Sequence, residues 1–375
     1  LKHFDFQSQG KALQMGYMDV AALGKANGRT VVLMHGKNFC AATWDSSIQA
    51  LSEAGYRVIA PDQIGFCTSS KPDNYQYSFQ QLATNTQQLL KALGIQKATL
   101  LGHSTGGMLA TRYALLYPEQ VDQLALVNPI GLEDWKALGV PYRTVDQWYQ
   151  RELKVTAQGI RDYERNTYYD GRRKPEFDRW VDMLAGLSNG PGKTQVAWNS
   201  ALIYDMIFTQ PVYYEFKDLK MPTLLLIGTS DTTAIGKDLA SPEVKAKIGH
   251  YEVLGRQVAK LIRQSTLVEC PGMGRALHPS HGRDDRRHAG LAGPGRLQRW
   301  PLGLCRRCAG RAAGSIASPV AGIAWQPRSG HAPAFFPQRG KPPAVATRDA
   351  VGIVAAAEHA QRHPQRGDWW GHRRH

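Results

Sequence analysis

Long apolar runs are missing from this chain of 375 residues. A helix that crosses a bilayer needs about 20 consecutive apolar residues, and no stretch of the sequence approaches that length. The sequence therefore predicts a soluble protein without a membrane span. It begins at Leu1, with neither an initiator Met nor a charged-then-apolar leader. A periplasmic protein whose leader has been removed and a cytoplasmic protein both fit this beginning.

Cysteine is also scarce. The five cysteines make an odd count without regular spacing, at Cys40, Cys67, Cys270, Cys305 and Cys308. This pattern predicts a fold without a disulfide framework, in which Cys67 has a packing role. Cys305 and Cys308 form a single C-x-x-C motif. Because a structural zinc site needs four ligands and no second pair follows, the sequence predicts no metal site.

The last hundred residues lack tyrosine and hold only one lysine. Residues 276–375 contain 15 Arg, 13 Gly, 10 Pro and 8 of the 12 His, and 16 basic against 5 acidic residues give them about +11 of the net charge of +15. Pro and Gly at this density interrupt long packed elements, which predicts an irregular, low-complexity basic tail. We expect no nucleic-acid partner beyond non-specific contacts of this tail.

Three explanations compete for the tail. It is an arm that binds an anionic ligand, an ordinary disordered extension, or the product of a frameshift or gene fusion in GC-rich DNA, which favours Arg, Gly, Pro, Ala and His. We favour the third explanation, because the change of composition falls inside a motif that is discussed below.

The first 275 residues alternate short apolar runs with helical patterns, which predicts a mostly parallel sheet flanked by helices. The runs are rich in Leu and β-branched residues and do not alternate with polar residues, as suits strands buried on both faces. They are Thr30–His35, Tyr56–Asp62, Ala98–Ser104, Gln123–Pro129, Thr223–Asp231 and Ser265–Gly272. We also expect a helix capped by Ser78 and an edge hairpin within Phe4–Val20.

Between Pro129 and Pro222 the strand rhythm stops, and the chain becomes helix-like and aromatic. This stretch lies between two strands of the sheet. It therefore predicts an inserted helical cap, residues 133–220, over the carboxyl ends of the strands, where open α/β sheets bind ligands. The core then consists of residues 1–132 and 221–275.

The strongest chemical signal is LLGHSTGG at residues 100–107. The G-x-S-x-G pattern follows an apolar strand and opens a helix, Thr105–Tyr117, which is the context that a nucleophile elbow requires. The glycines permit a sharp turn that exposes the serine hydroxyl, and the helix N-terminus favours developing negative charge. This predicts Ser104 as a nucleophile, with His103 as a packing residue beside it.

A second signal, HGKNF at residues 35–39, comes directly after a strand. Acyl transfer needs two hydrogen-bond donors for the oxyanion of the tetrahedral intermediate. We expect one to be the backbone N–H of Thr105. The other is expected from this loop, with the Lys37 N–H as first candidate and the Asn38 N–H as second.

Four segments over about residues 30–275 resemble successive motifs of the α/β-hydrolase superfamily: HGKNFCAATW, PDQIGFCTSSKP, LLGHSTGGMLATRYALLYP and LLLIGTSDTTAIGK. The resemblance is closest to bacterial capped esterases, among them those of the serine-dependent macrolide-esterase kind. It implies an α/β-hydrolase fold and a catalytic triad whose acid, after the strand that follows the cap, is Asp231. Asp62 in PDQIG is a rival acid.

The sequence departs from this family where the base should stand. The family places a His just after the last strand, in a P-x-x-G-H arrangement, whereas this chain has Arg275 after Pro271-Gly272-Met273-Gly274. A guanidinium stays protonated near neutral pH and cannot act as a general base. His278 is the first candidate to replace it and His281 the second. The composition changes at the same place, so a shifted reading frame would explain both observations.

Together these patterns predict a serine-dependent hydrolase of small-molecule carboxylic esters or lactones that acts through an acyl-enzyme, without metal or cofactor. The predicted site consists of the nucleophile Ser104, the acid Asp231, the base His278 and the oxyanion amides of Lys37 and Thr105. Two alternatives remain open. One is a hydrolase of carbon–carbon bonds with the same constellation, and the other is a scaffold whose catalysis is impaired or lost because Arg275 replaces the base.

Overall fold

The structure is a computed structural model that describes residues 1–167, 171, 175–272 and 274. The candidate bases His278 and His281, the residue Arg275, the pair Cys305 and Cys308 and the predicted tail lie outside the described residues.

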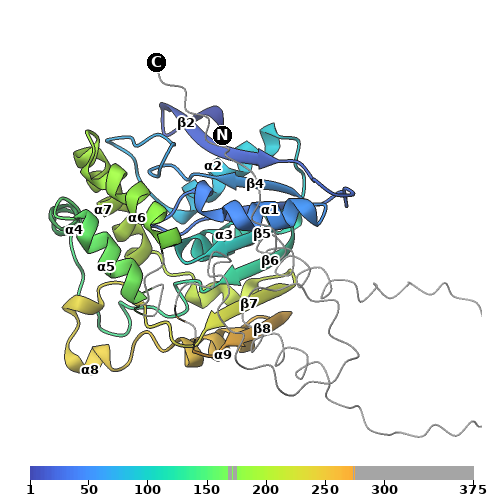
Figure 1. Ribbon diagram of the computed structural model, residues 1–375. Coiled ribbons are helices and arrows are strands. Elements are labelled where there is room, and N and C mark those ends of the chain that lie inside the picture. Colours follow the sequence, from blue (N-terminus) through green and yellow to red (C-terminus); the bar gives the residue numbers. More distant parts are fainter. Residues whose placement is uncertain (168–170, 172–174, 273, 275–375) are drawn as a thin grey trace, which may run out of the picture.

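An eight-stranded sheet runs through the molecule in the order β1-β2-β4-β3-β5-β6-β7-β8 (Figure 1). The hairpin of β1 and β2 forms one edge and pairs antiparallel to β4, and all pairs from β4 to β8 are parallel. This confirms the predicted α/β-hydrolase fold with a mostly parallel sheet. The strands are β1 (Lys2–Ser8), β2 (Lys11–Val20), β3 (Thr30–Met34), β4 (Arg57–Pro61), β5 (Ala98–His103), β6 (Val121–Val127), β7 (Thr223–Gly228) and β8 (Ser265–Cys270).

Side chains of successive residues on the central strands pack into two separate hydrophobic cores. On β7, Leu224 and Leu226 face one core, and Leu225 and Ile227 face the other, as the two-residue period of a strand requires. The first core includes helix α1 (Asp45–Glu53). The second includes three helices: α2 (Phe79–Ala92), α3 (Thr105–Leu116) and α9 (Tyr251–Leu261). Burial of each large apolar side chain contributes about 1.5–3 kcal/mol, so both faces stabilise the sheet.

Side-chain caps begin three of the helices in the described part of the chain: α2, α4 (Val145–Glu152) and α8 (Pro242–Lys245). Ser78 caps α2 as predicted, because its Oγ accepts a hydrogen bond from the Gln81 N–H at 3.0 Å. Short helical turns complete the connections: η1 (Ala41–Trp44), η2 (Pro118–Gln120), η3 (Tyr213–Asp218), η4 (Lys237–Leu239) and α8 (Pro242–Lys245).

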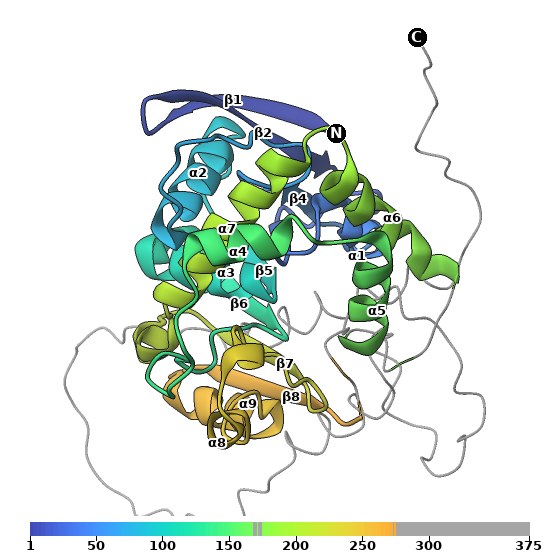
Figure 2. The same ribbon diagram turned by 90° about the vertical axis from the view of Figure 1, so that its left-hand side faces the viewer.

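Helices α4 (Val145–Glu152), α5 (Ala157–Thr167), α6 (Pro175–Asn189) and α7 (Lys193–Thr209) connect β6 to β7 and gather at one end of the strands (Figures 1 and 2). A capping box of Thr144 and Gln147 begins α4. The indole of Trp148 then stacks on the ring of Tyr204 in α7, with centroids 4.1 Å apart. No helix within the described residues is both long and apolar enough to cross a membrane.

Candidate active site

Ser104 occupies a strained turn between β5 and α3. Its backbone has φ 56° and ψ −122°, in the region that residues with a Cβ avoid, and the residue is only 3% exposed. The turn is held by the Gly107 N–H and the Ile130 N–H, which both donate to the Ser104 carbonyl. A Cβ on Gly106 would lie 2.1 Å from the Met34 carbonyl oxygen, so only glycine fits there. Strain of this kind persists where the surroundings enforce it, as at a nucleophile elbow.

The loop after β3 lies directly against this serine. A Cβ on Gly36 would lie 3.0 Å from the Ser104 Cβ and 3.3 Å from its Oγ. The Gly36 carbonyl is fixed by two donors, the Phe39 N–H at 3.1 Å and Nδ1 of His35 at 2.8 Å. His35 Nε2 accepts from the Gln63 N–H at 3.1 Å, so the ring carries its proton on Nδ1. Burial lowers the pKa of His35, which favours this neutral form.

This arrangement determines which way the next amide points. In a trans peptide the carbonyl and the following N–H point in opposite directions, so the Lys37 N–H points away from the His35 ring. Within the part of the chain that the structure describes, the N–H groups of Lys37 and Asn38 donate to no protein acceptor. Thr105 is the first residue of α3, and its N–H has no partner within the helix. The amides of Lys37 and Thr105, which the sequence predicts as the oxyanion donors, thus donate to no acceptor among the described residues.

Asp231 follows β7, and the residue is 3% exposed. Oδ1 accepts a hydrogen bond from the Thr233 N–H at 2.9 Å, and the Asp231 N–H donates to the Gly228 carbonyl at 3.1 Å. Among the described residues, no donor reaches Oδ2. A buried carboxylate oxygen without a donor is costly, so Oδ2 of Asp231 retains the capacity to accept a further hydrogen bond.

Asn128, directly after β6, lies beside the candidate site and was not predicted from the sequence. It is fully buried and has φ 38°. Its Oδ1 accepts from the Gly228 N–H at 2.6 Å, and its Nδ2 donates to the Gly274 carbonyl at 3.0 Å. One side chain therefore ties the strand that leads to Asp231 to the residue immediately before position 275. The signal in the sequence was an Asn directly after a buried strand, a residue type that tolerates positive φ.

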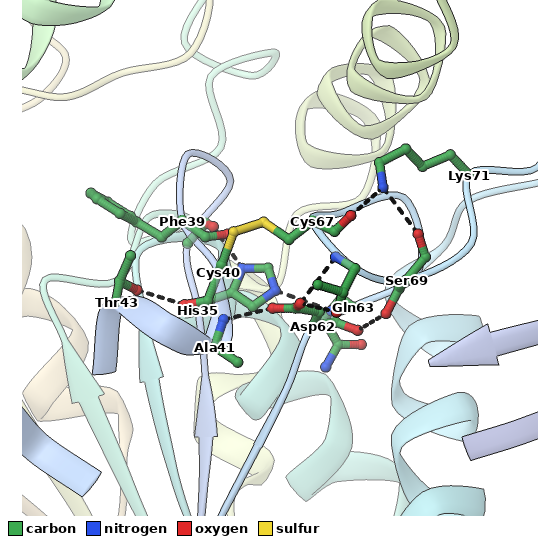
Figure 3. Close-up of a disulfide and its surroundings, with 12 residues drawn as sticks. His35, Phe39, Cys40, Ala41, Thr43, Asp62, Gln63, Cys67, Ser69 and Lys71 are labelled. Carbon is green, nitrogen blue, oxygen red and sulfur yellow. Dashed lines mark hydrogen bonds between the residues drawn. A yellow bond between two sulfur atoms is a disulfide. The ribbon is translucent and has the colours of Figure 1, made fainter. Parts of the chain in front are cut away.

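The rival acid Asp62 already has partners. Oδ1 accepts from the Ala41 N–H at 2.6 Å, and Oδ2 accepts from the Thr68 N–H at 3.1 Å and from its Oγ1 at 2.5 Å. Asp62 is buried, and its carboxylate joins the segment after β3 to the segment after β4 (Figure 3).

The sequence predicted no disulfide framework and a packing role for Cys67, but Cys67 is bonded to Cys40. Cys40 and Cys67 form a disulfide with their Cα atoms 5.9 Å apart (Figure 3). Parallel pairing of β3 with β4 brings the two loops together, which residue counts cannot reveal. The two sulfurs and the Asp62 carboxylate lie within 4.8 Å of one another, close enough for metal ligands. The disulfide commits both sulfurs, so we do not assign a metal to this cluster.

A cavity of about 410 Å³ lies between these loops and helices α4–α7. The Lys37 side chain forms part of the cavity wall. Its Nζ lies 3.3 Å from Glu152 Oε2 and 3.7 Å from the centroid of the Tyr204 ring. The Ser200 hydroxyl donates to the same carboxylate oxygen at 2.5 Å. Burial lowers the pKa of Lys37, and Glu152 opposes this shift. Ser104 does not itself line the cavity, whereas Lys37, which follows the Gly36 that approaches Ser104, does.

The chain belongs to the alpha/beta hydrolase fold family, whose model matches residues 29–252. The match spans β3, the elbow, the helices between β6 and β7, and the Asp231 loop. It confirms the resemblance found in the sequence at the level of the superfamily.

Similar proteins extend this assignment. A solved structure from Pseudomonas aeruginosa, described as a "probable hydrolytic enzyme", is 64% identical, covers 73% of this chain and 88% of its own, and has a TM-score of 0.72. The "Putative non-heme chloroperoxidase" of Synechocystis sp. is 26% identical over 73% of this chain and 93% of that protein. YfhM of Bacillus subtilis, named an AB hydrolase superfamily protein, is 37% identical over 30% of this chain, and the match covers 39% of YfhM.

Proposed function

We propose that this protein hydrolyses carboxylic esters or lactones through an acyl-enzyme formed on Ser104. The conformation of Ser104 is the observation that carries the proposal. A non-glycine residue held at φ 56° between a buried strand and a helix is costly, and it presents the hydroxyl where an amide-rich loop meets a helix N-terminus.

In the proposed reaction, Ser104 Oγ attacks the ester carbonyl carbon, and its proton passes to a general base. The carbonyl oxygen becomes an oxyanion that the Thr105 and Lys37 amides stabilise. Collapse of the intermediate expels the alcohol, which takes up the proton, and water then attacks the acyl-enzyme in the same way to release the acid. Contacts made only in the transition state raise kcat, so the two amides act mainly on turnover.

Asp231 supports the base in this proposal. Its buried Oδ2, which meets no donor among the described residues, is placed to accept a hydrogen bond from an imidazolium and to orient that ring. The base itself is proposed to be His278, which must approach from beyond Gly274. The Asn128 side chain holds Gly274 near the ends of β6 and β7, which supports an approach from that side.

The cavity supports a substrate of moderate size. About 410 Å³ lies within the range of pockets that bind drug-sized ligands, and apolar or aromatic side chains such as Phe39, Phe66, Ile160 and Tyr204 contribute to its wall. We propose that helices α4–α7 act as a cap that encloses one part of the ester beside the loop of Lys37.

The test compares the full-length protein with its Ser104→Ala variant on short p-nitrophenyl esters and on lactones. Ser104→Ala should reduce kcat/KM by at least a hundredfold with an unchanged melting temperature, because losses of a nucleophile cost several orders of magnitude. Ser241→Ala, which removes a hydroxyl from an exposed cap of α8, serves as the matched control and should retain full activity. Equal rates in wild type and Ser104→Ala would overturn the proposal and favour the non-catalytic scaffold.

A further inference from the structure

The loop at residues 36–40, which carries the Lys37 amide, is attached covalently to the segment after β4. We propose that the Cys40–Cys67 disulfide positions this loop for oxyanion stabilisation, so that its reduction lowers kcat while the protein stays folded. The inference rests on the proposed function, because the loop matters for catalysis only if an oxyanion forms beside Ser104.

The disulfide lies at the far end of the loop from the serine. Gly36 contacts Ser104 at one end, and Cys40, which is buried, closes the other end through its bond to Cys67 (Figure 3). Only three residues separate Gly36 from Cys40. A tether at Cys40 therefore restricts the whole loop, including the Lys37 amide.

A second set of bonds mounts the loop on the same segment. The Asp62 carboxylate accepts from the Ala41 N–H and the Thr68 N–H, the residues that directly follow the two cysteines. At the near end, the Gln63 N–H donates to His35, whose other nitrogen donates to the Gly36 carbonyl. Both ends of the loop are thus held by the segment that begins at Asp62.

The hydrogen bonds and the disulfide restrict different movements of the loop. The chain of hydrogen bonds from Gln63 through His35 sets the direction of the Gly36–Lys37 peptide. The disulfide fixes how far Cys40, and with it the loop, can move from the segment after β4. Displacing a catalytic group by about 1 Å can cost about a hundredfold in rate, so even a small release at Cys40 should be visible in kcat.

The bond is also accessible to a reductant. Cys67 is partly exposed and lines the cavity, so we expect a small dithiol to approach the bond from the cavity side. Reduction transfers two electrons and two protons from the dithiol, yields the Cys40 and Cys67 thiols, and converts the dithiol to its own disulfide. Disulfides persist in oxidising compartments and are reduced in the cytosol, so the proposal favours a periplasmic enzyme over a cytoplasmic one.

The experiment measures kcat and KM of the oxidised full-length protein, of the same protein after dithiothreitol, and of the double variant Cys40→Ser/Cys67→Ser. Peptide mapping of alkylated thiols verifies the state of Cys40 and Cys67 in each sample. We expect reduction to lower kcat at least tenfold with KM changed less than about twofold, since oxyanion donors act in the transition state. The double variant should match the reduced wild type and be insensitive to dithiothreitol, and re-oxidation of the wild type should restore kcat.

Cys270→Ser is the matched control, because Cys270 is a buried thiol outside the loop. It should respond to dithiothreitol as the wild type does. Hydrogen exchange adds a readout that needs no turnover: reduction should accelerate exchange in the peptide that contains residues 36–40 and leave α9 unchanged. It also serves if the double variant does not fold.

Unchanged kcat in protein whose Cys40 and Cys67 are shown to be reduced would overturn the proposal, as would unchanged exchange in the 36–40 peptide. Failure of the proposed function looks different. In that case the oxidised protein shows no Ser104-dependent hydrolysis, and the exchange experiment alone decides whether the disulfide positions the loop.

Discussion

Replacing Asn128 should destabilise the protein strongly, because its buried side chain makes two hydrogen bonds beside the site. Asn128→Ala removes two hydrogen bonds, at 2.6 and 3.0 Å, and leaves the Gly228 N–H and the Gly274 carbonyl without their partner. Each buried backbone group left unsatisfied costs about 1–3 kcal/mol, so the free energy of unfolding should fall by about 2–6 kcal/mol. Such a loss is a large part of the roughly 5–15 kcal/mol that stabilises a domain.

Two further variants separate the causes. Asn128→Gly loses the same two bonds but tolerates φ 38°, so the loss that it shares with Asn128→Ala reports the hydrogen bonds rather than backbone strain. Asn128→Asp keeps an acceptor for the Gly228 N–H, yet as a carboxylate it cannot donate to the Gly274 carbonyl.

Urea unfolding followed by circular dichroism measures these differences, provided that the m-value stays constant. A loss below about 0.5 kcal/mol in both Asn128→Ala and Asn128→Gly would refute the role assigned to this side chain. The variant Asn128→Asp provides a second test of this role. Because a protonated carboxyl can donate, the stability of Asn128→Asp relative to wild type should improve as the pH falls.

Three other predictions concern the acid, a buried carboxyl and the base. Asp231→Asn should lower kcat at least a hundredfold with little change in KM, measured on a p-nitrophenyl ester; an unchanged rate would remove Asp231 from the triad. Burial raises the pKa of Glu164 from 4.5 to about 8, so between these pH values the folded state holds a proton that the unfolded chain has released. The free energy of unfolding therefore falls as the pH rises through this range. Glu164→Gln should therefore gain stability relative to wild type as the pH rises to 8 in urea titrations, and parallel curves would contradict the assignment. Arg275→His should raise kcat/KM without restoring it to the level of related esterases, whereas His278→Ala should abolish the residual wild-type rate; activity unaffected by His278→Ala would exclude that residue as the base.

The sheet could be predicted from the sequence because its strands are buried on both faces. Every residue of β7 is buried, which appears in the sequence as an unbroken apolar run. The elbow at Ser104 was predictable for a local reason as well, since the strand, the glycines and the helix all lie within LLGHSTGG. The exact ends of the strands were not, because a run such as Thr223–Asp231 includes the loop that carries the acid beyond Gly228.

Long-range contacts account for what the sequence analysis missed. Asn128 acts on Gly228 and Gly274, residues 100 and 146 positions away, and no local pattern specifies such partners. Cys40 and Cys67 are 27 residues apart and meet only because β3 and β4 are neighbours in the sheet. The odd number of cysteines gave no indication of this pair. The availability of the Lys37 amide also depended on where the Gly36 carbonyl was directed, which only the folded loop determines.

Covalent labelling tests whether Ser104 is an activated nucleophile. The folded full-length protein should be incubated with a fluorophosphonate, digested, and mapped by mass spectrometry, with Ser104→Ala as the control. We expect a single phosphonylated site at Ser104 that is absent in the control and absent after urea denaturation. A folded protein that remains unlabelled, or that is labelled equally in Ser104→Ala, would contradict it.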